Sequence, residues 1–209
     1  MTKDLLIVFV KNIKLGKVKT RLAKTIGNEA AIEVYSELVK LTEEATQHIV
    51  IDKHIYFSDA IIEDKWPNTF KTVQQGKDLG ERMQNAFKTG FEKGYERIVL
   101  IGSDLPDIST EIIQDGLHTL KTSNVVFGPA EDGGYYLIGL TKMHGFIFKN
   151  KPWSEPNLLE ETLKELSSKN VEYSTLITLN DIDTLEDLLA SNFYKLNLRL
   201  QEKIKQLND

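Results

Sequence analysis

The sequence contains no cysteine, which excludes thiol catalysis, thiolate metal sites and a disulfide framework. This absence fits a reducing compartment, so we expect a cytoplasmic protein. No stretch without charge exceeds nine residues (122–130 and 133–141), whereas a membrane-spanning helix needs about 20 apolar residues. We therefore expect no membrane span. The five prolines form no linker and no repeat is visible, so residues 1–209 are predicted to form one domain.

Acidic residues are missing from one particular region, between Leu5 and Asn28. The formal net charge of the chain is -5, but six Lys and Arg residues give this region a local charge of +6. The acidic balance of the whole chain argues against binding polymeric nucleic acid. A local basic cluster can still bind a small phosphorylated molecule.

Short apolar runs alternate with amphipathic segments, which predicts an α/β protein with a mostly parallel sheet. In such sheets, ligands bind beyond the carboxyl ends of the strands. The expected strands are 5–10, 54–58, 69–74, 97–101, 124–128, 135–140 and 171–174. Helices are expected over 29–48, 79–93, 110–120 and 155–168, and from 185 onward, with Asn28, Asp78, Ser109 or Thr110, Ser154 and Thr184 as N-caps.

The basic loop KNIKLGKVKTRLA (11–23) directly follows the first expected strand. Gly16 permits left-handed backbone geometry, while Lys11, Lys19 and Arg21 supply positive charge at the strand end. Exposed backbone N–H groups together with Lys or Arg are suited to a nucleotide's phosphates. The alternative is a solvated basic surface loop. Neither the P-loop pattern nor G-x-G-x-x-G is present.

Acidic side chains also follow expected strands. Asp104, in IGSDLPD, comes directly after the strand 97–101 and can hold Mg²⁺ or Mn²⁺ against a diphosphate, although an ordinary turn is the alternative. In NDIDTLED (180–187), Asp181 and Asp183 precede a helix cap and are candidate metal ligands or simply helix-start residues. Ser103 has no evident histidine partner, so a hydrolase triad is not indicated.

Two further segments are candidates for substrate contact. In GPAEDGGYYLIGL (128–140), Glu131, Asp132 and the two glycines form either a plain hairpin turn or a flexible tip beside an aromatic wall for a second substrate. In QGKDLGERM (75–83), Arg82 can reach a phosphate or sugar, or pair with a surface acid.

Five motifs in order give the chain a family resemblance that spans Leu6 to Leu189. They are G-x-V-K-T-R-L, Q-G-x-D-L-G-x-R-M, S-D-x-P, G-P-x-x-D-G-G-Y-x-L-I-G-L and D-x-D-T-x-x-D-L. The set resembles the glycosyltransferase-like family of radical-SAM/selenodomain-associated transferases, some labelled arsenosugar-biosynthesis glycosyltransferases. It is more distantly similar to 2-phospho-L-lactate guanylyltransferase and molybdenum-cofactor guanylyltransferase.

The resemblance implies a three-layer, Rossmann-like GT-A (nucleotide-diphospho-sugar transferase) fold, an α/β fold with a mostly parallel mixed sheet. It also implies a divalent metal, Mg²⁺ or Mn²⁺, at Asp104 and Asp183. The residues expected to bind the nucleotide are Lys11, Gly16, Lys19, Arg21, Gln75, Arg82 and Ser103. The catalytic candidates are Asp132, Glu131 and Lys19.

Three functions remain open, because one fold hosts many reactions. The first is a glycosyltransferase, in which Asp132 or Glu131 takes a proton from an acceptor hydroxyl and Lys19 assists departure of the nucleoside diphosphate. The second is a nucleotidyltransferase that joins an NTP to a phosphorylated small molecule and releases pyrophosphate. The third is a nucleotide-binding regulator without turnover. The expected partners are a nucleotide sugar or NTP donor and a small-molecule acceptor.

Overall fold

A seven-stranded sheet organises residues 3–208, the part of the chain that the computed structural model describes. The strand order is β3-β2-β1-β4-β6-β5-β7, and β6 runs antiparallel to both of its neighbours while the other strands run in one direction. The α/β fold with a mostly parallel mixed sheet is therefore confirmed. The elements are β1 (Asp4–Val10), α1 (Thr20–Ile26), α2 (Asn28–Gln47), β2 (Asp52–Phe57), β3 (Phe70–Val73), α3 (Leu79–Glu92), β4 (Arg97–Ile101), α4 (Thr110–Thr119), β5 (Val125–Pro129), β6 (Tyr135–Leu140), η1 (Gly145–Phe148), α5 (Leu158–Ser168), β7 (Tyr173–Thr175), α6 (Leu185–Ala190), α7 (Asn192–Leu196) and α8 (Leu198–Asn208).

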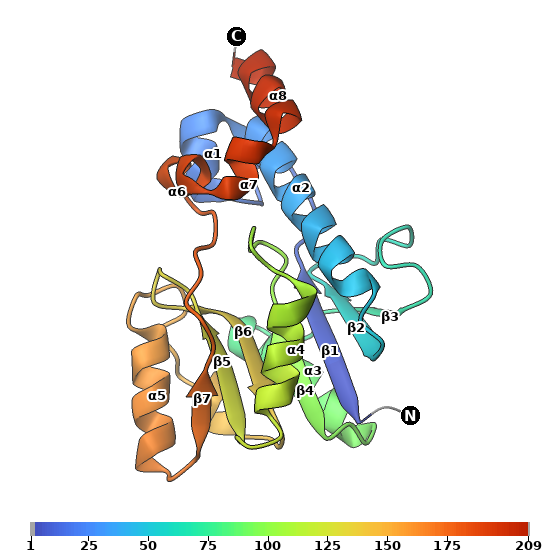
Figure 1. Cartoon of the computed structure of the whole chain (residues 1–209), viewed down its shortest axis with the longest axis vertical. Helices are drawn as coiled ribbons and strands as arrows, with labels where there is room; N and C mark the ends of the chain where they lie inside the picture. The colour runs from blue at the N-terminus through green and yellow to red at the C-terminus, as the bar shows by residue number, and fades with distance from the viewer. Residues whose placement is uncertain (1–2, 209) are drawn as a thin grey trace.

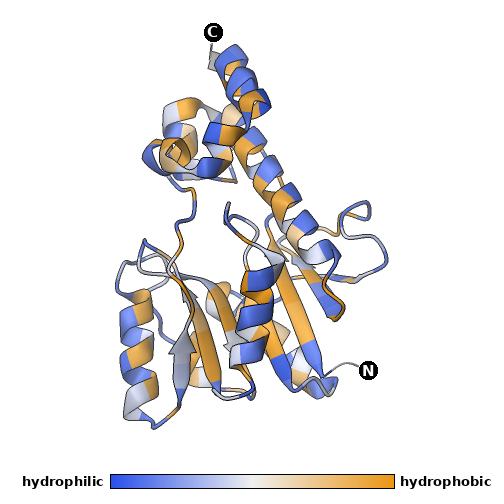
Figure 2. Cartoon of the chain, viewed as in Figure 1, coloured by the Kyte–Doolittle hydropathy of each residue, from blue (hydrophilic) through white to orange (hydrophobic). Residues whose placement is uncertain are grey.

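The central strands are apolar on both faces because helices cover both sides of the sheet. Along β1, Leu6 and Val8 pack into a cluster with α2 and α4, while Leu5 and Ile7 pack into another with α3 and α5. Successive side chains of a strand point to opposite faces, so a continuous apolar run is what a doubly covered strand requires. Figure 2 shows these strands as the most hydrophobic part of the molecule.

A group of helices lies beyond the carboxyl ends of the strands, and we call it the helical cap (Figure 1). It consists of α1, the first half of α2, and α6, α7 and α8, which share a separate apolar cluster. The cluster joins Leu22 of α1 and Val34 and Leu38 of α2 to Leu188 of α6 and Leu200 of α8. The cap thus combines segments that are more than 140 residues apart in the sequence.

Several helix boundaries were predicted correctly from the sequence. Asp78 caps α3, its side chain accepting a hydrogen bond from the Glu81 N–H, and Ser109 caps α4 in the same way. Thr184 and Asp187 form a reciprocal capping box at the start of α6. The predicted positions of the strands are confirmed to within a few residues.

Other boundaries were predicted wrongly. Asn28 is the first residue of α2 rather than its cap, since Gly27 holds that position. Ser154 lies at φ +68 in a turn, and α5 begins only after Asn157. The single C-terminal helix expected from residue 185 is three short helices, α6, α7 and α8. The helix α1 lies inside what the sequence predicted to be a basic loop.

No helix within residues 3–208 is long and apolar enough to cross a membrane.

Candidate functional site

A cleft of about 710 Å³ opens at the carboxyl ends of the strands, as the fold type predicts. Segments that follow β1, β2 and β4, the turn between β5 and β6, and the start of α3 all contribute to its wall. Its polar lining comprises Lys11, Asn12, Lys14, Lys17, Tyr35, Ser58, Asp59, Gln74, Arg82, Ser103, Asp104, Asp132, Tyr135, Tyr136, Trp153, Ser154, Glu155 and Asp181.

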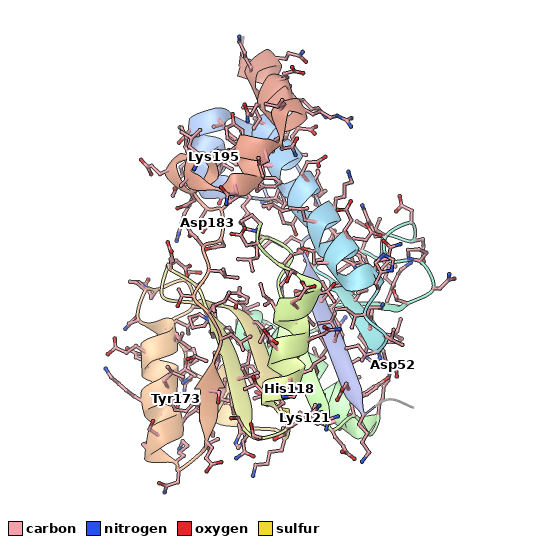
Figure 3. The ribbon with its side chains drawn as sticks, in the orientation of Figure 1. Asp52, His118, Lys121, Tyr173, Asp183 and Lys195 are labelled. Carbon is pink, nitrogen blue, oxygen red and sulfur yellow. The ribbon has the colours of Figure 1, made fainter. Side chains whose placement is uncertain are left out.

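The Lys19 ammonium lies beside the cleft and joins two carboxylates from distant parts of the chain. Its Nζ atom is 3.2 Å from Asp104 Oδ2 and 3.3 Å from Asp183 Oδ1, and its side chain is only 3% exposed. Arg21 approaches the other oxygen of Asp183, with Nη1 3.4 Å from Oδ2. Asp183 lies on the segment between the sheet and the helical cap (Figure 3). The two predicted metal ligands are therefore brought together, with a lysine between them.

The electrostatics of this cluster keep its ions charged. Burial by itself would lower the pKa of Lys19, but Asp104, Asp183 and Asp181 outweigh burial and leave its pKa above the ordinary value. Burial likewise opposes ionisation of Asp104, yet Lys19 and then Lys11 hold the pKa of that carboxyl below its usual range. Lys19 and Asp104 thus form an ion pair at neutral pH.

Asp181 differs from Asp104, because the positive charge of Lys19 does not offset the causes that raise its pKa. Burial is the largest cause that raises its pKa to about 6, and repulsion from Asp104, Asp183 and Asp132 adds to burial despite the attraction of Lys19. Asp181 therefore keeps its proton to a higher pH than an exposed aspartate does. Asp181 forms part of the cleft wall, whereas Asp183, the metal ligand implied by the family resemblance, lies outside that wall.

A buried tyrosine fixes the start of the basic loop. The Tyr35 hydroxyl accepts a hydrogen bond from the Lys11 N–H (2.9 Å) and shares another with Ser103 Oγ (2.8 Å). Tyr35 comes from α2 and Ser103 from the end of β4, so this contact joins the ends of β1 and β4 at the base of the cleft. No signal in the sequence marked this polar role of Tyr35.

The basic loop bends sharply before α1. Gly16 has φ +69, as expected of a left-handed position, and Lys19 itself has φ +44. Lys11 is part of the cleft wall, whereas Gly16, Lys19 and Arg21 lie outside that wall. The left-handed Lys19 ends the loop and starts α1, which explains why the helix was missed.

The turn between β5 and β6 is anchored, which favours the plain hairpin turn over the flexible tip. Gly133 has φ +87, and its carbonyl accepts a hydrogen bond from the Leu159 N–H at 3.0 Å. An added Cβ atom would lie 1.8 Å from the Pro156 carbonyl oxygen, so a residue larger than glycine does not fit. Asp132 accepts from the Gly134 N–H and faces the cleft, while the exposed Glu131 does not line it.

The first turn of α3 contributes Arg82 to the cleft, and the segment before α3 contributes Gln74 rather than the predicted Gln75. The Arg82 Nε atom donates to the Gly76 carbonyl at 3.2 Å, and the Gln75 carbonyl accepts from the Asn85 side chain. Asn12 also lines the cleft and was not predicted from the sequence. Its carboxamide oxygen accepts hydrogen bonds from the backbone N–H groups of Asp59 and Ala60. These local bonds shape the loops around the cleft.

Comparisons with known proteins agree with this architecture. A family model described as "Uncharacterized protein conserved in bacteria (DUF2064)" matches residues 39–155. A solved structure from Desulfovibrio desulfuricans G20, described as a candidate nucleotide-diphospho-sugar transferase, is 32% identical, with 99% of each chain covered and a TM-score of 0.87. The similarity to this structure extends over Lys19 and Asp183, which lie outside the family match.

Two more distant similarities are to proteins named as a guanylyltransferase and as a synthase. A 2-phospho-L-lactate guanylyltransferase from Methanocaldococcus vulcanius is 27% identical over 191 residues, covering 88% of this chain and 82% of the relative. The 4-diphosphocytidyl-2C-methyl-D-erythritol synthase from Anaerococcus prevotii is 11% identical, with 93% and 99% of the two chains covered and a TM-score of 0.55. The latter likeness shows the shared fold alone.

Proposed function

The chain belongs to the DUF2064 family, and from this membership and the geometry of the cleft we propose that it is a nucleotidyltransferase. It is a transferase, and the proposed reaction joins an NTP to a phosphorylated small molecule with release of pyrophosphate. The observation that supports this most is the Asp104–Lys19–Asp183 cluster beside a cleft whose adjoining loop carries Lys11, Lys14 and Lys17. The names of the guanylyltransferase relatives support the same reaction.

The lining suggests a role for each side of the cleft. Lys11 and the loop that contains Gly16 bind the phosphates, with Arg21 beside them, because a triphosphate needs several donors and positive charges. Ser103, held by Tyr35, and the Gln75–Arg82 segment contact the rest of the nucleotide. An oxygen of the acceptor's phosphate attacks the α-phosphorus, the bond from the α-phosphorus to the oxygen bridging the α- and β-phosphates breaks, and pyrophosphate leaves with that oxygen.

A divalent cation suits the acids of this site. Asp181, Asp104 and Asp183 offer carboxylate oxygens, and burial together with repulsion from the neighbouring acids raises the pKa of Asp181. Within residues 3–208, no three acidic or histidine side chains form a complete metal site by themselves. Mg²⁺ is typically bound by one or two carboxylates together with substrate phosphates, so Asp104 and Asp183 would hold it jointly with the nucleotide. Such an ion supplies charge neutralisation for the departing pyrophosphate.

Glycosyl transfer is the second candidate, because the structure that is 32% identical is described as a nucleotide-diphospho-sugar transferase. Asp132 faces the cleft, and in this reaction it would take a proton from an acceptor hydroxyl, with Lys19 assisting the leaving group. Glu131, exposed and outside the cleft, is a weaker candidate for this base. The finer resemblance to radical-SAM/selenodomain-associated transferases belongs with this second candidate.

One experiment separates the two reactions. We would incubate the protein and Mg²⁺ with each NTP and 2-phospho-L-lactate, and separately with UDP- and GDP-sugars, while measuring pyrophosphate release and sugar-nucleotide hydrolysis. The thermal shift produced by each nucleotide would be measured in parallel, since saturation at about 100 times Kd stabilises a protein by about 2.7 kcal/mol. Pyrophosphate release dependent on an NTP supports nucleotidyl transfer. Stabilisation by sugar nucleotides together with their hydrolysis, and no pyrophosphate from any NTP, would reject it in favour of glycosyl transfer.

A variant of the central acid tests the site itself. Asp104→Asn should abolish the metal-dependent part of nucleotide stabilisation, because it removes one of the two carboxylates that Lys19 joins. Asp107→Asn, three residues further on and outside the cleft lining, is the matched control. Unchanged metal-dependent binding in Asp104→Asn would refute the assignment of Asp104.

A further inference from the structure

Lys19 places a buried ammonium between Asp104 and Asp183, the two carboxylates that the proposed function assigns to a divalent ion. Its ammonium is within 3.3 Å of an oxygen of each carboxylate, and its side chain is almost fully buried. The two acids come from the end of β4 and the segment before α6, and no other cation within residues 3–208 bridges them. Arg21 contacts only Asp183, and its side chain is 58% exposed.

The backbone around Lys19 is shaped to deliver this ammonium. Lys19 adopts φ +44 and ψ +50, a left-handed conformation that costs a non-glycine residue about 1 kcal/mol or more. The N-cap position of α1 gains no side-chain hydrogen bond from this geometry. No side-chain hydrogen bond in the helix cap therefore offsets this strain. The left-handed conformation instead brings the ammonium into contact with the two acids.

We propose that Lys19 is the resident counter-ion of Asp104 and Asp183, and that it releases these carboxylates to a divalent ion only when a nucleotide's phosphates arrive to receive its ammonium. The metal and the nucleotide then enter together, and the metal binds the protein alone only weakly. This inference rests on the proposed use of a nucleotide, but it concerns the order of binding rather than the reaction.

The physical reason is the cost of an unpaired buried charge. A free metal ion that displaced Lys19 would leave its ammonium buried without a partner, which is strongly unfavourable. Phosphate oxygens remove that penalty because they pair with the ammonium as well as with the metal. Lysine suits such an exchange, since its charge sits on a flexible four-carbon chain and can turn from one anion to another.

Titration with Mn²⁺, monitored by calorimetry and by the EPR signal of free Mn²⁺, tests the proposal. The wild-type protein should bind Mn²⁺ at least tenfold more tightly with GTP, or the NTP that gives the largest thermal shift, than without any nucleotide. Lys19→Met should bind Mn²⁺ alone at least tenfold more tightly than the wild type, because the acids are then free. Lys24→Met removes an equal charge from an exposed position on α1 and should leave Mn²⁺ binding unchanged.

Two results would overturn the proposal. One is wild-type protein that binds Mn²⁺ equally tightly with and without nucleotide, a measurement that needs no variant to fold. The other is a folded Lys19→Met variant, verified by circular dichroism, that binds Mn²⁺ alone no better than the wild type. Neither result depends on which reaction is catalysed, so a sugar-nucleotide substrate would overturn the proposed function without altering this test.

Discussion

Removal of one hydroxyl group, in Tyr35→Phe, tests whether the base of the cleft depends on a single side chain. The substitution keeps the ring in the core but removes the acceptor of the Lys11 N–H bond and the partner of Ser103 Oγ. Each lost hydrogen bond costs about 1 kcal/mol, so the free energy of unfolding should fall by about 2 kcal/mol. Urea denaturation followed by fluorescence measures this loss.

The same substitution should also weaken nucleotide binding, because Lys11 would no longer be fixed at the end of β1. We expect the Kd for the nucleotide, measured by calorimetry, to rise roughly tenfold, which corresponds to about 1.4 kcal/mol. Tyr95→Phe is the matched control. It removes a tyrosine hydrogen bond to Asp52 (2.8 Å), at the amino end of β2 and far from Asp183 (Figure 3).

The two variants should therefore separate stability from binding. Tyr95→Phe is expected to lose stability and keep the wild-type nucleotide affinity. If Tyr35→Phe loses stability but binds the nucleotide as tightly as the wild type, then Tyr35 does not position Lys11. If the free energy of unfolding is unchanged in Tyr35→Phe, then the two hydrogen bonds of the Tyr35 hydroxyl do not stabilise the fold.

Three further predictions concern other parts of the chain. Burial is the main cause that lowers the pKa of His54 to about 4 in the folded protein. Below pH 6.5 the unfolded state therefore binds a proton that the folded state does not. The free energy of unfolding, measured in urea, should fall by up to about 3 kcal/mol between pH 6.5 and pH 4. Gly133→Ala should lower that free energy by about 2–4 kcal/mol, because the new Cβ meets the Pro156 carbonyl at a positive φ. Asp181 has a pKa of about 6 in the folded protein, above its unfolded value, so the free energy of unfolding falls as the pH rises from the unfolded pKa to the folded one. Asp181→Asn removes this charge and should raise the melting temperature at pH 7.5, by the equivalent of about 1 kcal/mol. At pH 4 it should have no such effect.

Matched substitutions give these predictions their controls. The exposed His48→Gln should keep the wild-type pH dependence that His54→Phe removes. Gly94→Ala shares a positive φ (+90) but has open space around its Cβ, so it should cost only about 1 kcal/mol. An Asp181→Asn protein with an unchanged melting temperature at pH 7.5 would show that burial and the neighbouring carboxylates do not destabilise the charged form of this residue.

The sequence predicted the sheet well because apolar runs and N-caps are local signals. The run from Leu5 to Val10 identifies a strand covered on both faces, and Asp78 and Thr184 identify helix starts by their own side-chain chemistry. The location of the cleft followed from the prediction of a mostly parallel sheet, whose ligands bind beyond the carboxyl ends of the strands. Local residue patterns therefore predict a segment correctly where its conformation depends on residues within that segment.

The remaining features depend on contacts between distant segments. Ser154 has the composition of an N-cap, but it turns at φ +68 while the segment that follows it anchors Gly133. The start of α1 follows a left-handed lysine, whose conformation is coupled to acids 85 and 164 positions away. The polar role of Tyr35 likewise arises only when α2 lies across the ends of β1 and β4.

The composition of the helical cap has a consequence for the synthesis of the protein. The apolar face formed by Leu22, Val34 and Leu38 is made early, but Leu188 and Leu200, which cover it, are translated about 150 residues later. Until then this face is open to non-specific association, and Lys19 lacks Asp183. The binding site is thus completed only after α6 has been translated, so a ribosome-stalled chain that stops at the end of β7 should expose this face to chaperones and bind the nucleotide more weakly.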